Sequence, residues 1–358
     1  MQLLILSAAF VLLALVLVAE RRYNMRCLRT FKAVVHVNGI RGKSGTCRLL
    51  DAALRERYRT FTKTTGTDAR TIDVLGADTK LRRIGTPRIS EQLSIIRRAH
   101  REGAEALIME CMAVRPELQR AAQREIVQAK YVAITNVRRD HVPEMGTSLD
   151  EIAAALANTI PDNGVLFTAD AAYYPFFAER CRLRNSRCVL CAEDLPGHEN
   201  ESIAHAIARE LGLSDAQIAR GFAKVQRDFG ARRLYVLPGG KTTLLNLFSC
   251  NDPDSALEQL ADIGEVPTFL YNHRWDRPDR AQLFAEHFFP RYPGATVLLL
   301  GGSPLVRRLL LRAEPTLTLR NLGRWEDALS HSGPLVGLGN IMGEAHKMIE
   351  CLEAQAVR

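Results

Sequence analysis

A glycine-rich segment between a predicted strand and a predicted helix constrains the fold of this chain more than any other feature. The apolar run Ala33–Val37 predicts a short buried strand, and apolar residues at helical spacing follow from Cys47 to Tyr58. The sequence between them is Asn38-Gly39-Ile40-Arg41-Gly42-Lys43-Ser44-Gly45-Thr46. A strand that turns through glycines directly into a helix is typical of α/β proteins, in which the helix N-terminus offers a site for anions.

The composition of this turn predicts that it binds the phosphates of a nucleotide. Backbone N–H groups of such a loop can surround phosphate oxygens, and glycine allows the close approach. We expect the Lys43 ammonium to reach the terminal phosphates of ATP and the Ser44 hydroxyl to bind Mg²⁺. The other residues expected to line the phosphates are Gly39, Arg41, Gly42, Gly45 and Thr46. The first glycine stands only three residues before Gly42, so a plain glycine-rich turn with a solvated lysine is the alternative.

The rest of the chain predicts two α/β domains. Buried strands are expected at Ala106–Met109, Tyr131–Thr135 and Gly164–Thr168, and the helical segments between them indicate a mostly parallel sheet. A second alternation of strands and helices begins near residue 230. We therefore expect an ATP-binding domain at residues 21–230 and a smaller, Rossmann-like α/β domain at residues 231–358.

The N-terminus predicts a membrane anchor. Residues 1–19 carry no charged side chain, and about 20 apolar residues cross a bilayer as a helix. A cleaved signal peptide, the main alternative, has its basic residues before the apolar run, whereas here they follow it. They are Arg21, Arg22, Arg26, Arg29 and Lys32. This asymmetry predicts one transmembrane helix at residues 1–20 in the inner or plasma membrane, with the following domains in the cytoplasm.

The composition excludes several classes of protein. With 358 residues, 47% apolar and 25% charged, the chain is neither disordered nor a small disulfide scaffold. Its eight cysteines show no regular framework, and the lone pair Cys188 and Cys191 has no partners that would complete a zinc set. The net charge is +8, but only 6% of residues are aromatic and no motif interleaves basic with aromatic residues. Nucleic acid is therefore not an expected partner.

Three ordered motifs resemble those of the Mur ligase and folylpolyglutamate synthase superfamily, whose members are ATP-dependent amide ligases. The shortened loop Gly39–Ser44 resembles the phosphate loop of that superfamily. Thr135–His141 (TNVRRDH) is similar to its TNxxxDH segment, and Lys63–Thr67 (KTTGT) is similar to its strand that ends in a TxGT turn. Within the superfamily, Glu110–Gln119 (ECMAVRPELQ) and the N-terminal anchor resemble the ligase subunits of poly-γ-glutamate synthases.

This resemblance implies a Mur-ligase-like ATPase domain with a phosphate loop and a parallel sheet, followed by the Rossmann-like domain. It implies that Glu110 and His141 hold metal ions with Ser44, and that both take part in catalysis with Lys43. Glu110 could instead cap a helix or lie on the surface, and His141 could be a core histidine that hydrogen-bonds the backbone. The resemblance also implies that Asn136 approaches the adenine or supports the loop. Two aspartates complete the expected set: Asp252 faces the nucleotide or forms a plain turn, and Asp140 orients its own loop.

Other cationic residues carry weaker expectations. Arg274 and Arg277 are candidates for binding a polymer carboxylate through bidentate contacts, whereas Arg280 is expected on a solvated basic face. Superfamily enzymes often carry a carbamylated lysine, for which Lys80 and Lys224 are the candidates.

The function implied is the polymerisation of glutamate through γ-linkages by way of an acyl phosphate, with ATP and Mg²⁺ as cofactors. Expected partners are glutamate, the growing poly-γ-glutamate chain, integral-membrane and accessory subunits of a synthase or export complex, and further copies of the chain. One alternative is a Mur-type ligase for another amino acid or acceptor. The other is a catalytically weak, nucleotide-binding subunit that assembles an export complex.

Overall fold

The computed structural model describes residues 1–65, 69–82, 86–191, 198–225, 232–240, 242–261 and 268–356. Contacts divide the chain into two compact units. Unit 1 comprises Met1–Val137 and Asp150–Gln226, and unit 2 comprises Arg138–Leu149 and Arg227–Arg358. The segment 138–149 thus groups with unit 2, although the sequence placed it inside a domain of residues 21–230. The expected boundary near residue 230 lies outside the described residues and stays a prediction.

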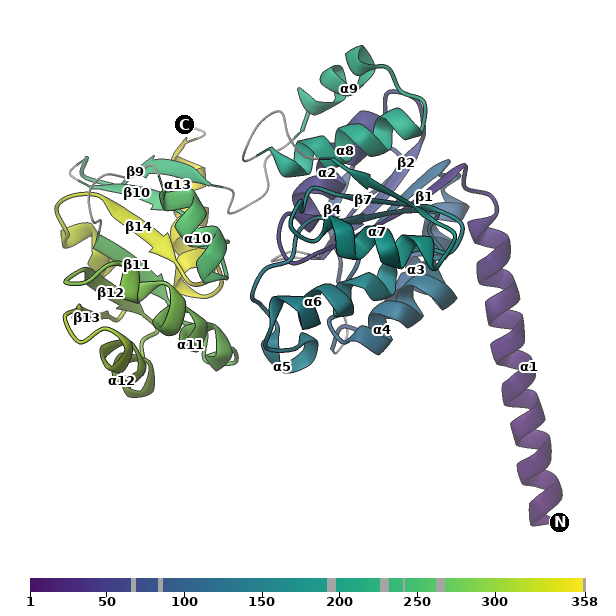
Figure 1. The fold of residues 1–358 in the computed structure, drawn as a ribbon, viewed down its shortest axis with the longest axis horizontal. Coiled ribbons are helices and arrows are strands. Elements are labelled where there is room, and N and C mark those ends of the chain that lie inside the picture. The colour runs from purple at the N-terminus through teal and green to yellow at the C-terminus, as the bar shows by residue number, and fades with distance from the viewer. Residues whose placement is uncertain are drawn as a thin grey trace. The chain divides into compact units, whose positions relative to one another are not determined.

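Unit 1 contains an eight-stranded sheet in the order β4-β3-β2-β5-β1-β6-β7-β8 (Figure 1). The six strands β2, β5, β1, β6, β7 and β8 pair in parallel with their neighbours. The strands β3 and β4 extend the sheet beyond β2 and pair antiparallel. The mostly parallel sheet expected from the sequence is confirmed. The strand bounds are β1 Ala33–Asn38, β2 Thr60–Thr64, β3 Arg70–Ile72, β4 Asp78–Lys80, β5 Ala106–Glu110, β6 Tyr131–Ile134, β7 Val165–Thr168 and β8 Arg187–Leu190.

Helices cover both faces of this sheet. On one face, apolar side chains of α2, α8 and α9 pack against β1 and its neighbours in one core cluster. On the other face, η1 contributes Gln123, which hydrogen-bonds the buried His36 of β1, and α3 packs beside η1. The helices are α2 Lys43–Leu54, α3 Glu91–Arg101, α4 Pro116–Ala121, η1 Ala122–Val127, α6 Leu149–Leu156, η2 Ala157–Thr159, α7 Tyr174–Arg182, α8 Glu199–Glu210 and α9 Asp215–Phe222.

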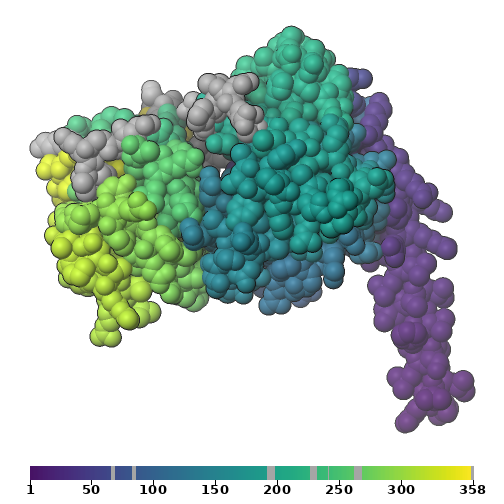
Figure 2. All heavy atoms as spheres, viewed as in Figure 1, coloured from purple at the N-terminus to yellow at the C-terminus, as the bar shows by residue number. Residues whose placement is uncertain are grey.

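The first helix, α1 (Gln2–Leu28), is long and apolar enough to cross a membrane. Its most apolar window has a mean hydropathy of 2.7 and is 0% buried, so it is not a core helix of unit 1. Figure 2 shows the N-terminal part of α1 projecting from the surface of unit 1. Only its C-terminal part, with the buried residues Asn24, Cys27 and Leu28, packs against the unit.

Unit 2 contains a six-stranded sheet in the order β13-β12-β11-β14-β10-β9, in which only β9 is antiparallel. One face packs against α10, α11 and α12, and the other against α13 and η4. The strands are β9 Arg233–Val236, β10 Thr243–Asn246, β11 Thr268–Asn272, β12 Thr296–Leu300, β13 Thr318–Leu322 and β14 Leu335–Leu338. The helices are α5 Val142–Met145, α10 Pro253–Leu260, α11 Pro278–His287, η3 Phe289–Arg291, α12 Pro304–Ala313, η4 Trp325–Ser330 and α13 Glu344–Ala356.

His36 is a buried titratable group in the central strand of unit 1. Its side chain is fully buried, with Nδ1 2.9 Å from Oε1 of Gln123. Burial lowers the pKa of the imidazole to about 4, and the charge of Lys63 acts in the same direction. The ring is therefore neutral in the folded protein at neutral pH, with Nδ1–H as the donor to Gln123.

This lowered pKa predicts that unit 1 loses stability in mild acid. Between pH 6.5 and 4 the unfolded chain takes up a proton at His36 that the folded chain refuses, so unfolding becomes easier as the pH falls. We expect a loss of about 2 kcal/mol on going from pH 7.5 to pH 5. Urea denaturation of the wild-type protein and of His36→Asn, each at pH 7.5 and at pH 5, measures this change in the free energy of unfolding. The difference between their pH profiles should disappear if His36 does not titrate in this way.

Candidate functional site

The predicted phosphate loop lies between the carboxyl end of β1 and the first residue of α2. Two of its glycines adopt backbone conformations that other residues rarely take, with φ +121° at Gly39 and +79° at Gly42. A Cβ on Gly39 would lie 2.1 Å from Thr135 Oγ1 and 2.7 Å from the Thr135 backbone nitrogen. A Cβ on Gly42 would lie 2.1 Å from Asn200 Oδ1. Both positions therefore favour glycine for their conformation, and Gly39 also requires it for space, because its Cβ would meet backbone.

Gly39→Ala is expected to distort this loop. The new Cβ meets backbone, which cannot move aside as a side-chain end can, and the positive φ adds about 1–3 kcal/mol of strain. We expect ADP affinity, measured by isothermal titration, to fall more than about tenfold. Gly333→Ala is the matched control, because Gly333 has a similar φ of +112° with open space around it. Equal ADP affinity in wild type and Gly39→Ala would contradict the assigned loop geometry.

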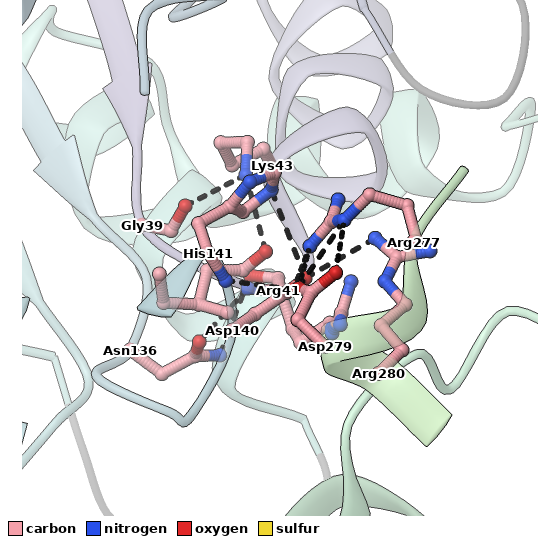
Figure 3. A network of polar contacts seen from close by, with 10 residues as sticks. Gly39, Arg41, Lys43, Asn136, Asp140, His141, Arg277, Asp279 and Arg280 are labelled. Carbon is pink, nitrogen blue, oxygen red and sulfur yellow. Dashed lines mark hydrogen bonds and ion pairs between the residues drawn. The ribbon is translucent and has the colours of Figure 1, made fainter. Parts of the chain in front are cut away.

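Lys43 and Asn136 hold the loop from its two sides (Figure 3). Lys43 Nζ donates to the carbonyl oxygens of Gly39 at 2.7 Å and Ile40 at 3.1 Å, so the ammonium lies over the loop. Asn136 Oδ1 accepts the backbone N–H of Arg41 at 2.9 Å, and its Nδ2 donates to the Arg41 carbonyl at 3.3 Å. Asn136 was expected either to approach the adenine or to support the loop, and these hydrogen bonds support the loop.

Glu110 ends β5 and reaches the first turn of α2. Its carboxylate accepts hydrogen bonds from Ser44 Oγ at 2.8 Å, from the Thr65 backbone N–H at 2.7 Å and from Thr65 Oγ1. Only 2% of Glu110 is exposed. The structure thus brings together Ser44 and Glu110, two of the three residues expected to hold a metal.

The donor chemistry at this point fits Mg²⁺. A serine hydroxyl and a carboxylate are hard oxygen donors, and Mg²⁺ commonly takes one or two protein carboxylates while phosphates and waters complete its shell. No three histidine, cysteine, aspartate or glutamate side chains gather into a metal cage in the described part of the chain. Ser44 and Glu110 are therefore suited to a nucleotide-bound Mg²⁺ rather than to a metal held by protein alone.

Three residues that build this site were not predicted from the sequence. Thr65 stood in a quoted motif without a role, and it supplies two of the hydrogen bonds to Glu110. Thr135 Oγ1 donates to the Arg41 carbonyl. Asn200, at the start of α8, accepts a hydrogen bond from Thr46 Oγ1 at 3.1 Å, and no motif pointed to it. Thr46 was expected to line the phosphates. Its side chain is instead fully buried, and its hydroxyl contacts Asn200.

Unit 2 contains a cluster of charges around Asp140, whose members Arg277, Asp279 and Arg280 are labelled in Figure 3. Asp140 accepts the backbone N–H of the next residue, His141, at 2.8 Å, and so orients its own loop. Its carboxylate oxygens lie 2.9 Å from Nη2 of Arg277 and 3.3 Å from Nη2 of Arg280. Arg280 is only 8% exposed, so its expected place on a solvated face was wrong: a buried guanidinium needs the carboxylate beside it.

The remaining candidates of the sequence occupy ordinary structural positions. His141 has a φ of +53°, and its Nε2 lies 3.7 Å from Oδ2 of Asp140. Both residues belong to the segment that groups with unit 2. Asp252 is fully buried and caps α10 by accepting the Ser255 N–H at 2.8 Å. Lys224 forms an exposed ion pair with Glu56. The metal role of His141 and the nucleotide role of Asp252 stay predictions.

Comparison with known proteins decides the family. Residues 37–207 match the Mur ligase middle domain, and residues 234–355 match the poly-gamma-glutamate synthase CapB C-terminal domain. The chain is 33% identical over 391 aligned positions to PGA synthase CapB of Bacillus subtilis, covering 100% of this chain and 99% of the relative. The chain belongs to the CapB family. It is also 33% identical to the capsule biosynthesis protein CapB of Bacillus anthracis, covering 94% of this chain and 80% of the relative.

A solved structure extends the likeness of this CapB-family chain to the fold. The structure is bifunctional folylpolyglutamate synthase/dihydrofolate synthase with Mn, AMPPNP and L-glutamate bound. It matches with a TM-score of 0.65 and 14% identity, and the match covers 92% of each chain. The resemblance to the superfamily indicated by the motifs is confirmed. Family membership makes the chain an ATP-dependent amide ligase.

Proposed function

We propose that this ligase joins glutamate residues through γ-amide bonds and extends a poly-γ-glutamate chain by way of an acyl phosphate. The observation that carries the proposal is the contact of Ser44 with Glu110 beside the glycine-rich loop, in a chain related over its whole length to PGA synthase CapB. A buried carboxylate and a partly buried hydroxyl at a helix N-terminus suit a metal-nucleotide complex.

The first step activates a carboxylate that is otherwise inert toward amines. A carboxylate oxygen of the chain end attacks the γ-phosphorus of ATP, the bond to the β-phosphate oxygen breaks, and ADP leaves. In the proposal, Lys43 and the loop N–H groups bind the β- and γ-phosphate oxygens and stabilise the charge that develops on them. Mg²⁺, when held by Ser44 and Glu110, would neutralise further charge on the same oxygens.

The second step forms the amide. The amine of the incoming glutamate, having lost the proton of its ammonium form, attacks the acyl carbon. Inorganic phosphate leaves with the electron pair of the former acyl–oxygen bond, and the nitrogen releases a second proton to solvent as the amide forms. The substrates and the product are anions, so the arginines of the Asp140 cluster are candidates for binding a polymer carboxylate. Arg277 is the better candidate of the two, because Arg280 is the more deeply buried.

Hydroxylamine tests the acyl phosphate directly. It attacks the activated carbon in place of glutamate and gives a stable glutamyl hydroxamate and free phosphate. We expect the full-length protein in detergent to form hydroxamate only when ATP, Mg²⁺ and glutamate or its oligomer are all present. Phosphate release without hydroxamate, at every glutamate concentration, would contradict the proposal.

We further propose that α1 anchors the ligase in the cytoplasmic membrane and that the enzyme works there with integral-membrane and accessory subunits. The support for the anchor is the unburied apolar window of α1, followed by basic residues. The support for further subunits is chemical, because a polyanion made in the cytoplasm needs a protein path to cross the bilayer.

A further inference from the structure

Two exposed arginines of α1 and the arginine that caps its C-terminus follow the apolar part of the helix on one face. Arg22, Arg26 and Arg29 are spaced i, i+4 and i+7, which places them on one side of a helix. All three are exposed. We call this set the arginine stripe.

The opposite face of α1 is fixed to unit 1. Glu20 forms an ion pair of 2.7 Å with Arg97 of α3. Asn24, 1% exposed, donates from Nδ2 to the Ile126 carbonyl of η1 at 2.9 Å. These residues lie roughly half a turn around the helix from Arg22, at 100° per residue. Because the docked face fixes the rotation of α1, the arginine stripe points away from the body of unit 1.

The residues that the structure describes do not balance the charge of the stripe. The neighbouring cations have acidic partners, Glu125 for Arg21 at 3.0 Å and Glu105 for Lys32 at 2.7 Å. Among the residues that the structure describes, none forms an ion pair with the stripe. Like charges at this spacing repel each other. The helix dipole favours Arg26, which lies in the last turn of α1, but not Arg22, which lies more than one turn before its end at Leu28.

The position of the stripe identifies the anion. With a rise of about 1.5 Å per residue, Arg22 lies roughly 5 Å and Arg26 roughly 10 Å beyond the apolar run. Side chains on a helix lean toward its N-terminus, which here is toward the bilayer. The headgroup layer is about 5–8 Å thick on each side. With α1 spanning the bilayer as proposed above, the guanidinium groups of Arg22 and Arg26 would reach headgroup phosphates, and Arg29 would extend the same positive face.

We propose that the arginine stripe binds the headgroups of anionic phospholipids and fixes unit 1 on the membrane surface. The proposal rests on the membrane anchoring proposed above. A second class of anion, the acidic polymer that the ligase makes, is disfavoured because the stripe begins at the bilayer boundary and leans toward it.

Spin-labelled lipids test the proposal on the full chain. Wild-type protein is reconstituted in phosphatidylcholine nanodiscs that carry trace spin-labelled phosphatidylglycerol or phosphatidylcholine, and the motionally restricted fraction of each label is measured. One arginine near an anionic surface contributes about a fivefold preference, so wild type should select phosphatidylglycerol at least about fivefold. Arg22→Gln/Arg26→Gln/Arg29→Gln should lose that preference. The matched control is Arg291→Gln/Arg308→Gln/Arg312→Gln, which removes the same charge from exposed arginines of unit 2.

The outcomes separate the proposal from the one on which it rests. Protein that no nanodisc retains would overturn the anchor. Retention with equal restriction of both lipids in wild type would overturn the lipid-binding stripe alone. An equal loss of lipid selectivity in the stripe variant and the control variant would also overturn the lipid-binding stripe. Polyglutamate that binds the wild type in pure phosphatidylcholine, but not the stripe variant, would assign the stripe to the polymer instead.

Discussion

Lys43→Ala is expected to abolish glutamate-dependent phosphate release. The Lys43 ammonium is held over the phosphate loop by the Gly39 and Ile40 carbonyls, where it can exchange those bonds for phosphate oxygens. Removal of one preorganised charge of this kind costs about 10²–10³ in rate. We expect a fall of about 10³-fold in kcat, measured as phosphate released per enzyme in the presence of ATP, Mg²⁺ and glutamate.

The control for this variant is Lys224→Ala. It removes the same charge from an exposed ion pair with Glu56, and we expect its rate within about twofold of wild type, since such pairs contribute little. Thermal unfolding of both variants checks that the fold is kept. A Lys43→Ala enzyme with wild-type turnover would remove the phosphate loop from the mechanism.

Glu110→Gln is expected to have the second-largest effect. The substitution keeps the size of the side chain but removes the charge, and its amide places a donor where Ser44 and Thr65 already donate. We expect kcat to fall about 10²-fold or more, because a charge that holds the metal is lost. Half-maximal activity should also require a higher Mg²⁺ concentration than in wild type. Titration of Mg²⁺ at saturating ATP measures both quantities.

Glu117→Gln serves as the comparison for Glu110. Glu117 lies seven residues later in the same motif but is exposed at the start of α4. Its loss should leave the Mg²⁺ requirement unchanged. If Glu110→Gln loses activity with no change in Mg²⁺ requirement, Glu110 has a structural role and the proposed metal site is wrong.

Most of the fold could be predicted because its signals are local. The short apolar strands β1, β5, β6 and β7 are buried on both faces, and their sequences read as continuous apolar runs. The strands β3, β4, β8 and β13 were not predicted. They are three to five residues long, lie at or near a sheet edge and are polar in part, so they carry no periodic pattern. α2 begins at Lys43, earlier than its apolar spacing indicated, because Gly42 in a left-handed conformation allows the helix to start there.

The site could be predicted where recognisable motifs contain its residues. The loop with Lys43 and Ser44 is contiguous in sequence, and Glu110 belongs to a second motif, so the contact of Ser44 with Glu110 was expected. Residues outside any motif gave no such signal: Asn200 reaches Thr46 across 154 residues of sequence. The burial of Arg280 was missed for the same reason, since its partner Asp140 lies in another segment of unit 2.

The measurement that tests the central claim most directly is a parallel assay of phosphate and amide product. Full-length protein in native membranes, with its partner subunits present, is supplied with ATP, Mg²⁺ and increasing glutamate. We predict that phosphate release rises with glutamate, that γ-linked product forms in an equal amount, and that both disappear in Lys43→Ala. ATP hydrolysis indifferent to glutamate, with no amide product, would contradict the assignment of this chain as a glutamate ligase.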